Sequence, residues 1–244
     1  MSTPDPGDIE PPRDPRAAFA ELSKIMLGEQ PLSATLERVA QLAKQTIPGA
    51  ADVSVTLLQD GEVASAAFTG PLAAQLDRQY EAGFGPCMDA ATSGTTITID
   101  DTAHSRRYPD FARAAARKGV RHTMSIGLPV QRQTIGALNL YGTDDVPFDE
   151  ATQELATAFA SYAAVAVANA GVYASTATLA ANLQRALESR AVIDQAKGIL
   201  MARHPGMSAD AAFDLLSKQS QLSNRKLRDI AAELVDEVQR GGQD

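Results

Sequence analysis

The sequence predicts an α+β domain with an antiparallel sheet, followed by a long helical connector and a small all-α unit. Three observations lead to this prediction. Five segments between residues 52 and 142 have the composition and the bounding turn residues of β-strands. No proline occurs between Pro147 and Pro205, which favours helix over that span. Three apolar stripes with helical spacing occupy the C-terminal part of the chain.

The first 16 residues predict a disordered tail. They hold five of the thirteen prolines and almost no large apolar side chain, so they bury too little surface to offset the entropy of ordering. From Ala17 onward the apolar residues recur with helical spacing, and a break at residues 28–31 divides this stretch in two. Two helices are therefore expected before the first strand.

Five strands and two further helices are expected between these N-terminal helices and residue 142. The first two strands flank Asp60-Gly61, a pair that tolerates the positive φ angles of a two-residue hairpin turn. The last two strands form a closing hairpin. The strands are expected at residues 52–59, 62–69, 95–100, 123–132 and 134–142. Helices at residues 72–80 and 111–118 interleave with them, which predicts an α+β domain over residues 17–170.

The proline-free segment predicts a long helix that leads out of this domain. Tyr162 and Val165, and then Leu179, Leu183 and Ala186, recur at spacings of three and four. Such spacing suits a two-chain coiled coil in a homodimer, with residues 171–188 as the helical connector. Gly171 marks a candidate break. For residues 152–168, an ordinary helix packed on its own sheet is at least as good an interpretation.

Residues 189–240 predict three amphipathic helices around one small core. Pro205-Gly206 ends the first helix, Ser208 is the expected N-cap of the second, and Ser223 with Asn224 is expected to start the third. The core stripes are expected at Ile193, Ala196 and Leu200, at Ala209, Ala212, Phe213 and Leu216, and at Leu227, Ile230, Ala231 and Leu234.

Charge and cysteine content narrow the classes of function. The net charge of −8 argues against a protein that binds polyanions in general. This negative charge resides in residues 1–182, because residues 183–244 contain nine Lys and Arg and nine Asp and Glu. A single cysteine excludes an intramolecular disulfide, and the three histidines fall in no metal-ligand spacing. No apolar run would span a bilayer and no export pattern is apparent, so we expect a cytoplasmic protein with no metal and no membrane contact.

The sequence contains none of the catalytic motifs that carry a built-in mechanism, such as G-x-S-x-G or H-E-x-x-H, and no enzymatic activity is expected. The loop GFGPCMDAA at residues 83–91 holds Cys87, which is either a reactive thiol near a helix N-terminus or a small buried hydrophobic residue, the commoner case. Asp100-Asp101 and Asp144-Asp145 are interpreted as turn residues, and the basic stretch 117–122 as a solvated helix C-terminus.

The segment SNRKLR, residues 223–228, places three cations and no anion at the expected start of the third helix. Positive charge is unfavourable at a helix N-terminus, where the backbone N–H groups favour phosphate. With helical spacing, Asn224, Arg225 and Arg228 would share one hydrogen-bond-donating face. The pattern indicates a phosphate-contacting surface, with an ordinary solvated face as an equal alternative.

A second basic face is expected on the first helix of the same unit. Arg190 and Lys197 are seven residues apart, and Asp194 lies within helical contact distance of both, so a solvated ion-pair ladder is the simpler interpretation. Gly198 costs about 1 kcal/mol relative to alanine inside a helix, which suggests the close approach of another helix or of a ligand.

The stretch Ser189 to Asp236 contains R-x-x-I-x-x-A-K-G-x-L-M, then A-F-x-x-L, then S-N-x-K-L-x-x-I-A. It closely resembles the ANTAR domain, an RNA-binding module of bacterial transcription antitermination regulators. The resemblance implies that the unit binds the loop of an RNA hairpin, and that a dimer engages tandem stem-loops to control transcription termination. It implies RNA-binding roles for Arg190, Lys197, Gly198, Arg203, Asn224, Arg225, Lys226 and Arg228.

Residues 17–170 resemble a GAF sensor domain of the type fused to ANTAR. The signature is G-x-G-P-C-x-D-A, followed by D-D, a Y-P-x-F helix and a closing S-x-x-L-P…G-x-L-x-L-Y hairpin. The resemblance implies that the domain senses a small-molecule ligand or an upstream signalling protein, and it identifies no cofactor. A domain that serves only as a dimerisation platform stays an open alternative. Free-methionine sulfoxide reductases share this fold but need several cysteines, so a self-contained thiol cycle is discounted.

Two other functions stay open at this point. Three small helices can also present a recognition helix to the major groove, as in a DNA-binding transcription factor. A thiol-dependent GAF enzyme would use Cys87 as its nucleophile or redox centre.

Overall fold

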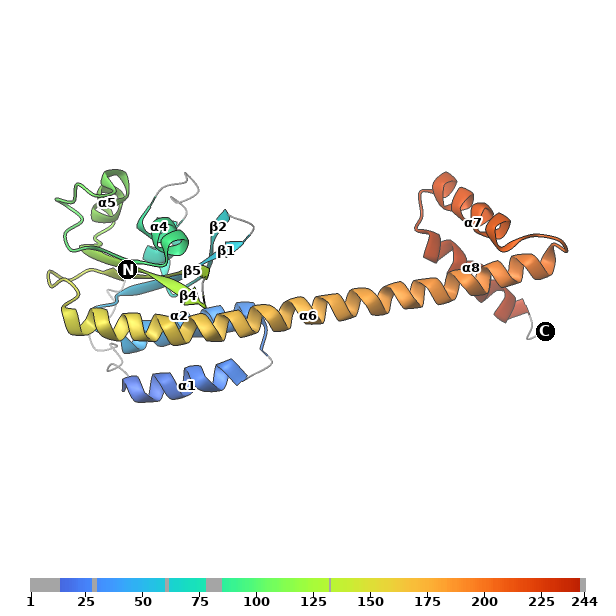
Figure 1. Cartoon of the computed structure of the whole chain (residues 1–244). Coiled ribbons are helices and arrows are strands. Elements are labelled where there is room, and N and C mark those ends of the chain that lie inside the picture. Colours follow the sequence, from blue (N-terminus) through green and yellow to red (C-terminus); the bar gives the residue numbers. More distant parts are fainter. Residues whose placement is uncertain (1–13, 28–29, 60–61, 78–84, 132, 242–244) are drawn as a thin grey trace, which may run out of the picture. The chain divides into compact units, whose positions relative to one another are not determined.

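The structure is a computed structural model that describes residues 14–27, 30–59, 62–77, 85–131 and 133–241. Figure 1 shows its helices and strands in sequence colours. The chain forms two compact units, one that ends at Ala174 and one that begins at Ser175. Of the predicted tail over residues 1–16, residues 1–13 lie outside the described residues, and the first helix begins at Pro15 rather than at Ala17. The turn at residues 60–61 and the end of the expected helix at residues 78–80 also lie outside the described residues.

The first unit is built on the predicted antiparallel sheet, whose five strands lie in the order β2-β1-β5-β4-β3. The two predicted hairpins are β1 with β2 and β4 with β5, and pairing of β1 with β5 joins them. The α+β prediction is confirmed, and each strand lies within two residues of its expected bounds. The strands are β1 Asp52–Gln59, β2 Glu62–Phe68, β3 Thr96–Ile99, β4 His122–Val130 and β5 Gln133–Gly142.

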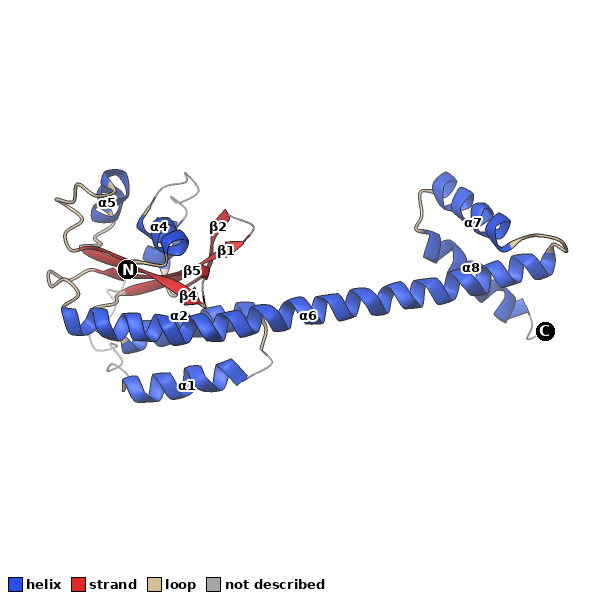
Figure 2. Ribbon diagram, in the orientation of Figure 1, coloured by secondary structure: helices blue, strands red, loops and turns tan. Residues whose placement is uncertain are grey.

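Successive side chains of a strand point to opposite faces of the sheet, so apolar residues at every second position gather on one face. One face of this sheet is apolar for that reason. Its buried core includes Val53 and Val55 of β1, Met124 of β4 and Leu138 and Leu140 of β5. Three helices contribute to the same core: α1 (Pro15–Leu27), α2 (Leu32–Thr46) and the first part of α6 (Glu150–Arg203). Figure 2 shows α2 and α6 on this side of the sheet and α4 and α5 on the other.

The opposite face, which we call the polar face, is equally buried and combines polar side chains with apolar ones such as Ile97 and Tyr141. The Asn139 amide donates hydrogen bonds to Ser54 Oγ at 3.1 Å and to Thr56 Oγ1 at 2.7 Å. Because a polar group buried without a partner is costly, this network explains how three polar side chains share one interior face. The network links neighbouring strands β1 and β5 and so supports their observed register.

Three short helices accompany the polar face: α3 (Pro71–Asp77), α4 (Pro86–Ser93) and α5 (Pro109–Arg117). Helix α4 lies within the segment that the sequence marked only as a conspicuous loop. It packs against β4 at Gly127, where a Cβ would come within 2.6 Å of Gly94 Cα and 2.7 Å of the Ala90 carbonyl oxygen. Glycine at this position is therefore what allows helix and strand to touch.

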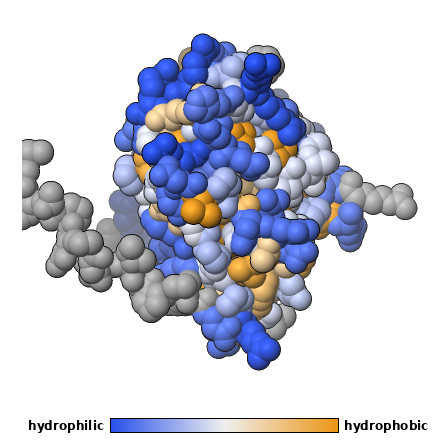
Figure 3. Space-filling view, turned by 90° about the vertical axis from the view of Figure 1, so that its left-hand side faces the viewer, coloured by the Kyte–Doolittle hydropathy of each residue, from blue (hydrophilic) through white to orange (hydrophobic). Residues whose placement is uncertain are grey.

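The surface of the first unit carries little continuous apolar area on the side shown in Figure 3. Hydrophilic residues predominate there, and hydrophobic ones form small separate patches. Single exposed apolar side chains of this kind are normal for a globular unit.

Helix α6 continues without interruption from Glu150 to Arg203, so the candidate break at Gly171 is wrong. Its first part packs on the sheet through Phe159, Ala163 and Val167, which confirms the packed-helix interpretation of residues 152–168. Farther along, several apolar side chains face solvent, among them Leu179 (60% exposed) and Leu183 (57%). Within the described part of the chain, α6 is the one helix long and apolar enough to cross a membrane, which is weak evidence for a membrane span; 44% of its most apolar window is buried inside the protein.

The second unit combines the last part of α6 with α7 (Ala209–Ser223) and α8 (Leu227–Gly241). As predicted, Ser208 caps α7, and its Oγ accepts a hydrogen bond from the Ala211 backbone N–H at 3.1 Å. Phe213 was expected in the core but is 42% exposed, because it lies about 100° around the helix from the buried Ala212. The small core consists of Ala196, Leu200, Ala212, Leu216, Ile230 and Ala231.

Candidate nucleic-acid interface

The turn between α7 and α8 differs from the sequence prediction. Ser223 is the last residue of α7, and Asn224 is its C-cap, with a left-handed φ of 52°. The Arg225 backbone N–H returns to the Ser220 carbonyl at 3.1 Å, and α8 begins only at Leu227. The expected N-cap at Ser223 and Asn224 is therefore wrong. Asparagine is favoured both at N-caps and in left-handed C-caps, and here the C-cap conformation is adopted.

This geometry changes the electrostatic argument for the basic segment. Arg225 follows the C-terminus of α7, where the helix dipole favours a cation, so its position carries no penalty. Lys226 directly precedes α8 and Arg228 lies in its first turn, where a cation is unfavourable. Asn224 and Arg225 lie outside the helix, so the predicted helical face shared with Arg228 is wrong. The segment instead presents its polar groups on an exposed turn.

Four of the eight residues implied for RNA binding are cations already paired with carboxylates. Arg225 Nη1 lies 2.7 Å from Glu233 Oε2, and Arg228 Nε lies 3.2 Å from Asp229 Oδ1. On α6, the Asp194 carboxylate lies 3.8 Å from Arg190 Nε and 3.5 Å from Lys197 Nζ, as expected for an ion-pair ladder. Exposed pairs of this kind contribute only about 0 to 1 kcal/mol, so a phosphate can displace them at small cost.

Lys226 and Arg203 differ from these four cations, because neither has an ion pair with any residue that the structure describes. Arg203 is six residues beyond Lys197, which places it about 120° around α6 from the face that Arg190 and Lys197 share. The structure therefore groups Arg190 with Lys197, and Asn224 with Arg225 and Lys226, but leaves Arg203 on another face.

Gly198 has no close neighbour in the chain. A Cβ at this position would meet no described atom within 4 Å outside the helix backbone, so the expected approach of another helix of this chain is wrong. The open surface at Gly198 leaves room for a contact with a ligand, which is the other explanation that the sequence offered for a glycine at this position.

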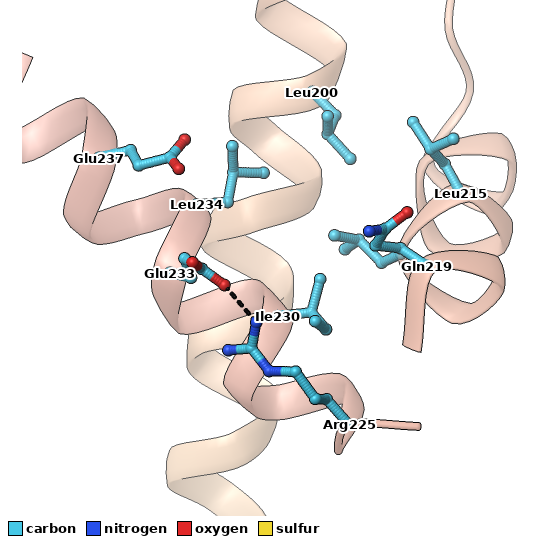
Figure 4. A pocket seen from close by; sticks show the side chains of 9 residues that line it. Leu200, Leu215, Gln219, Arg225, Ile230, Glu233, Leu234 and Glu237 are labelled. Atoms are coloured by element: carbon cyan, nitrogen blue, oxygen red, sulfur yellow. Dashed lines mark hydrogen bonds and ion pairs between the residues drawn. The ribbon is translucent and has the colours of Figure 1, made fainter. Parts of the chain in front are cut away.

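Two grooves border α8. The smaller, of about 250 Å³, is lined from α6 by Arg185, Glu188, Ser189 and Val192 and from α8 by Arg228, Asp229 and Ala232. The larger, of about 340 Å³, lies between α7 and α8 and is lined by Leu200, Leu215, Leu216, Gln219, Arg225, Ile230, Glu233, Leu234 and Glu237 (Figure 4). Sequence reasoning singled out neither Arg185 nor Gln219. The spacing of Arg185, Ser189 and Val192 by four and three residues places them on one face of a helix, and this spacing could have indicated that they line a common surface.

The sensor-side candidate, Cys87, is fully buried at the second position of α4. Its core neighbours include Ala73, Leu76, Phe111 and Tyr141. This environment supports the interpretation as a small buried hydrophobic residue, because a reactive thiol needs access to solvent and a means of holding the thiolate.

Two parts of the GAF-type signature meet directly in the structure. The Tyr108 hydroxyl, from Y-P-x-F, donates a hydrogen bond to the Asp89 carboxylate, from G-P-C-x-D-A. Burial and the neighbouring Asp89 carboxylate raise the pKa of Tyr108 above its usual value. The contact joins the start of α5 to α4 on the polar side of the sheet.

The acidic pairs serve as turn residues, as predicted. Asp101 accepts hydrogen bonds from the Ala103 and His104 backbone N–H groups, and the His104 side chain lowers the pKa of its carboxyl group. Asp144 accepts from the Val146 backbone N–H. Over the described ranges, no group of three or more His, Cys, Asp or Glu side chains forms a candidate metal site.

Comparison with known families agrees with the division into two units. The family model described as ANTAR domain matches residues 181–235, and the model described as GAF domain matches residues 29–168, more than half of the chain. No curated protein matches the chain significantly.

Among solved structures, the GAF domain of an Acinetobacter phosphoenolpyruvate-protein phosphotransferase aligns at 12% identity and a TM-score of 0.51, over 64% of this chain and 94% of that one. The GAF domain of a Coxiella burnetii phosphoenolpyruvate-protein phosphotransferase aligns at 15% identity and a TM-score of 0.51, over 66% of this chain and 96% of that one. Free methionine-R-sulfoxide reductase from Neisseria meningitidis aligns at 17% identity and a TM-score of 0.50, over 70% of this chain and 95% of that one. At these identities the likeness shows the fold alone.

Proposed function

Because the chain belongs to the GAF domain family and carries an ANTAR domain near its C-terminus, we propose that this signal-responsive regulator acts by binding RNA hairpins. The observation that carries the proposal is the coincidence of the ANTAR match with exposed cations and Asn224 around the α7–α8 turn. Cationic and amide side chains on an exposed surface suit phosphate contact and base reading, respectively.

In the proposed complex, Arg190, Lys197, Lys226 and Arg228 contact phosphates of an RNA loop, and Asn224 reads a base edge. Arg225 joins them when its pair with Glu233 exchanges for a phosphate. Gly198 gives the RNA an unobstructed approach to α6, and Arg203 extends the contact on a neighbouring face. Because the protein as a whole is acidic, affinity is expected to be modest and strongly salt-dependent.

The regulator works as a homodimer in this proposal, through the solvent-facing apolar residues of α6 such as Leu179 and Leu183. Two linked RNA-binding units then engage tandem stem-loops and gain affinity through effective concentration. A small-molecule ligand or a partner protein at the GAF domain shifts the dimer between two states and thereby controls transcription termination in the cytoplasm.

The test is a titration of the full chain against a two-hairpin RNA and a loop-scrambled control at two salt concentrations. The proposal expects tighter binding to the native loops and a loss of affinity at higher salt. Equal affinity for both RNAs would contradict loop recognition. Duplex DNA of the same length, added as a competitor, separates RNA binding from the DNA-binding alternative.

A thiol enzyme is the less supported function. The burial of Cys87 argues against it, since the described structure gives the sulfur no exposed surface. The likeness to a methionine sulfoxide reductase is one of fold alone.

A further inference from the structure

The groove between α7 and α8 has an apolar floor that is open to solvent. Figure 4 shows Leu200 and Leu234 at its back, with Leu215 and Gln219 on the α7 side. Its volume of about 340 Å³ falls within the range of about 300 to 1,000 Å³ typical of small-molecule sites. Leu215 is 46% exposed, although it sits beside the buried core. An apolar surface of this size would be covered favourably by a flat, uncharged group.

Polar groups surround this floor at the rim. Arg225 and Glu233 are fixed to each other at 2.7 Å, and Gln219 and Glu237 complete the lining. The two glutamates disfavour a phosphate inside the groove by charge repulsion. The same carboxylates accept hydrogen bonds from amino groups, and an amide such as Gln219 can both donate and accept. This donor and acceptor set matches the edge of a nucleobase better than it matches the charged backbone of a nucleic acid.

The groove continues into the basic turn. Arg225 belongs to both, because it follows Asn224 in the turn and also lines the groove. Lys226 is the next residue and has no ion pair among the described residues. A nucleotide whose phosphate contacts this turn would therefore have its base within reach of the apolar floor.

We propose that the α7–α8 groove receives one unpaired base of the RNA loop, which lies on Leu215 and Leu234 and is read by Gln219 and the Glu237 carboxylate. This inference rests on the proposed function. It adds a specificity site that contacts the base, separate from the cations that contact the backbone. The groove is too small to be a protein interface by itself, since a standard interface covers roughly 800 Å² on each partner.

The experiment uses the full chain and a pool of two-hairpin RNAs with randomised loop nucleotides. Binding and sequencing first identify the preferred loop, and each nucleotide of that loop is then replaced in turn by an abasic ribose. For the wild-type protein, we expect removal of one particular base to lower the affinity about tenfold or more. In Leu215→Ser, the intact RNA should bind about tenfold more weakly, and removal of that base should have no further effect.

Matched controls come from the same helix. Leu222 is 76% exposed, lies two turns after Leu215 and does not line the groove, so Leu222→Ser should retain the wild-type response to every abasic position. Gln219→Ala should relax the preference at the same single nucleotide, whereas Gln221→Ala should not. Lys226→Ala should weaken all loops alike, because a phosphate contact carries no sequence information.

The outcomes distinguish this inference from the proposed function. Loop-selective binding that Leu215→Ser and Gln219→Ala leave unchanged would overturn the groove as a base site and keep RNA binding intact. If the wild-type protein selects no loop at all, the proposed function fails, and the base site fails with it. A Leu215→Ser variant that changes self-association in sedimentation, with its loop preference preserved, would assign the groove to protein contact and overturn the inference.

Discussion

Arg225 and Glu233 are joined across the α7–α8 turn, with Nη1 of the guanidinium 2.7 Å from Oε2 of the carboxylate. Both side chains are about half exposed, at 48% and 51%. A candidate RNA-binding cation is thus already neutralised by a residue of its own unit. In the proposed complex, a phosphate would have to compete with Glu233 for this guanidinium, so we expect Glu233 to lower the affinity for RNA.

Glu233→Gln is expected to tighten RNA binding about two- to fivefold, because it removes the competitor for Arg225 while keeping the side chain's size. The salt dependence should steepen, since one more phosphate is neutralised in the complex. Titration at several salt concentrations measures both effects. Asp236→Asn makes the same change in net charge away from this pair; an equal gain there would show that bulk charge alone is responsible.

Lys226→Ala is expected to weaken RNA binding roughly 3- to 10-fold, the equivalent of about 1 kcal/mol, through loss of one phosphate contact. The slope of log affinity against log salt should fall in magnitude by about 0.7 to 0.9. The melting temperature should not change, because Lys226 is exposed and has no ion pair among the described residues. Lys218→Ala, on an exposed site of α7, is the control, and a drop in melting temperature for Lys226→Ala would mean a structural role.

Leu183→Lys is expected to convert the proposed homodimer to a monomer, because it places a charge among the solvent-facing apolar residues of α6. Affinity for a two-hairpin RNA should fall roughly 100-fold as bivalent binding is lost, while affinity for a single hairpin should be little changed. Sedimentation and titration provide the two measurements. Ala181→Lys adds the same charge about 160° around the helix from Leu183 and should remain dimeric; dissociation of both variants would argue against a specific seam.

Cys87→Ser is expected to lower the stability of the GAF domain by about 1 to 3 kcal/mol, because it replaces a fully buried thiol with a more polar hydroxyl. RNA binding should be unaffected below the melting transition. In the folded wild-type protein, the thiol should react with a thiol reagent only at the rate of unfolding. Rapid modification under native conditions would revive the thiol-enzyme alternative.

The start of α6 is expected to lose stability in acid. Hydrogen bonds from the Thr152 side chain and from the Thr152 backbone N–H lower the pKa of Asp149 below its ordinary value of 3.8. The Thr152 backbone nitrogen lies 2.8 Å from Asp149 Oδ1. Because the folded pKa is depressed, this contribution is fully present above pH 3.8 and is lost as the pH falls through the folded value. Melting temperatures of wild type and Asp149→Ala should therefore differ at pH 7 and converge as the pH falls through the folded pKa of Asp149; a constant difference would contradict the capping role.

The sheet could be predicted closely because its signals are local. Alternation of apolar and polar residue types in β1 and the Asp60-Gly61 turn signal in the sequence predict β1 and β2 within one residue of their observed bounds. Helix α4 was anticipated only as a helix N-terminus near Cys87, without bounds, because it is one short segment whose packing depends on Gly127, far along the chain. Contacts between distant segments of this kind leave no periodic signal in a sequence.

The candidate interface was predicted in its residues but not in its geometry. Asn224 suits two caps of opposite sense, and only the packing of α7 on α8 decides between them. Phe213 was expected in the core because it belongs to a stripe with helical spacing, whereas the buried side of α7 is centred on Ala212 and Leu216 and leaves Phe213 exposed. The ion pair of Arg225 with Glu233 also depends on where the turn places Arg225 relative to α8, whereas the pair of Arg228 with Asp229 joins adjacent residues of that helix.

The left-handed backbone at position 224 restricts which amino acids evolution can use there. Glycine would adopt the conformation readily but has no group with which to read a base. Aspartate tolerates it but would bring a negative charge toward the RNA backbone, and β-branched residues would be strained. Asparagine meets both demands, because it tolerates the left-handed backbone and carries an amide that can read a base in the proposed complex.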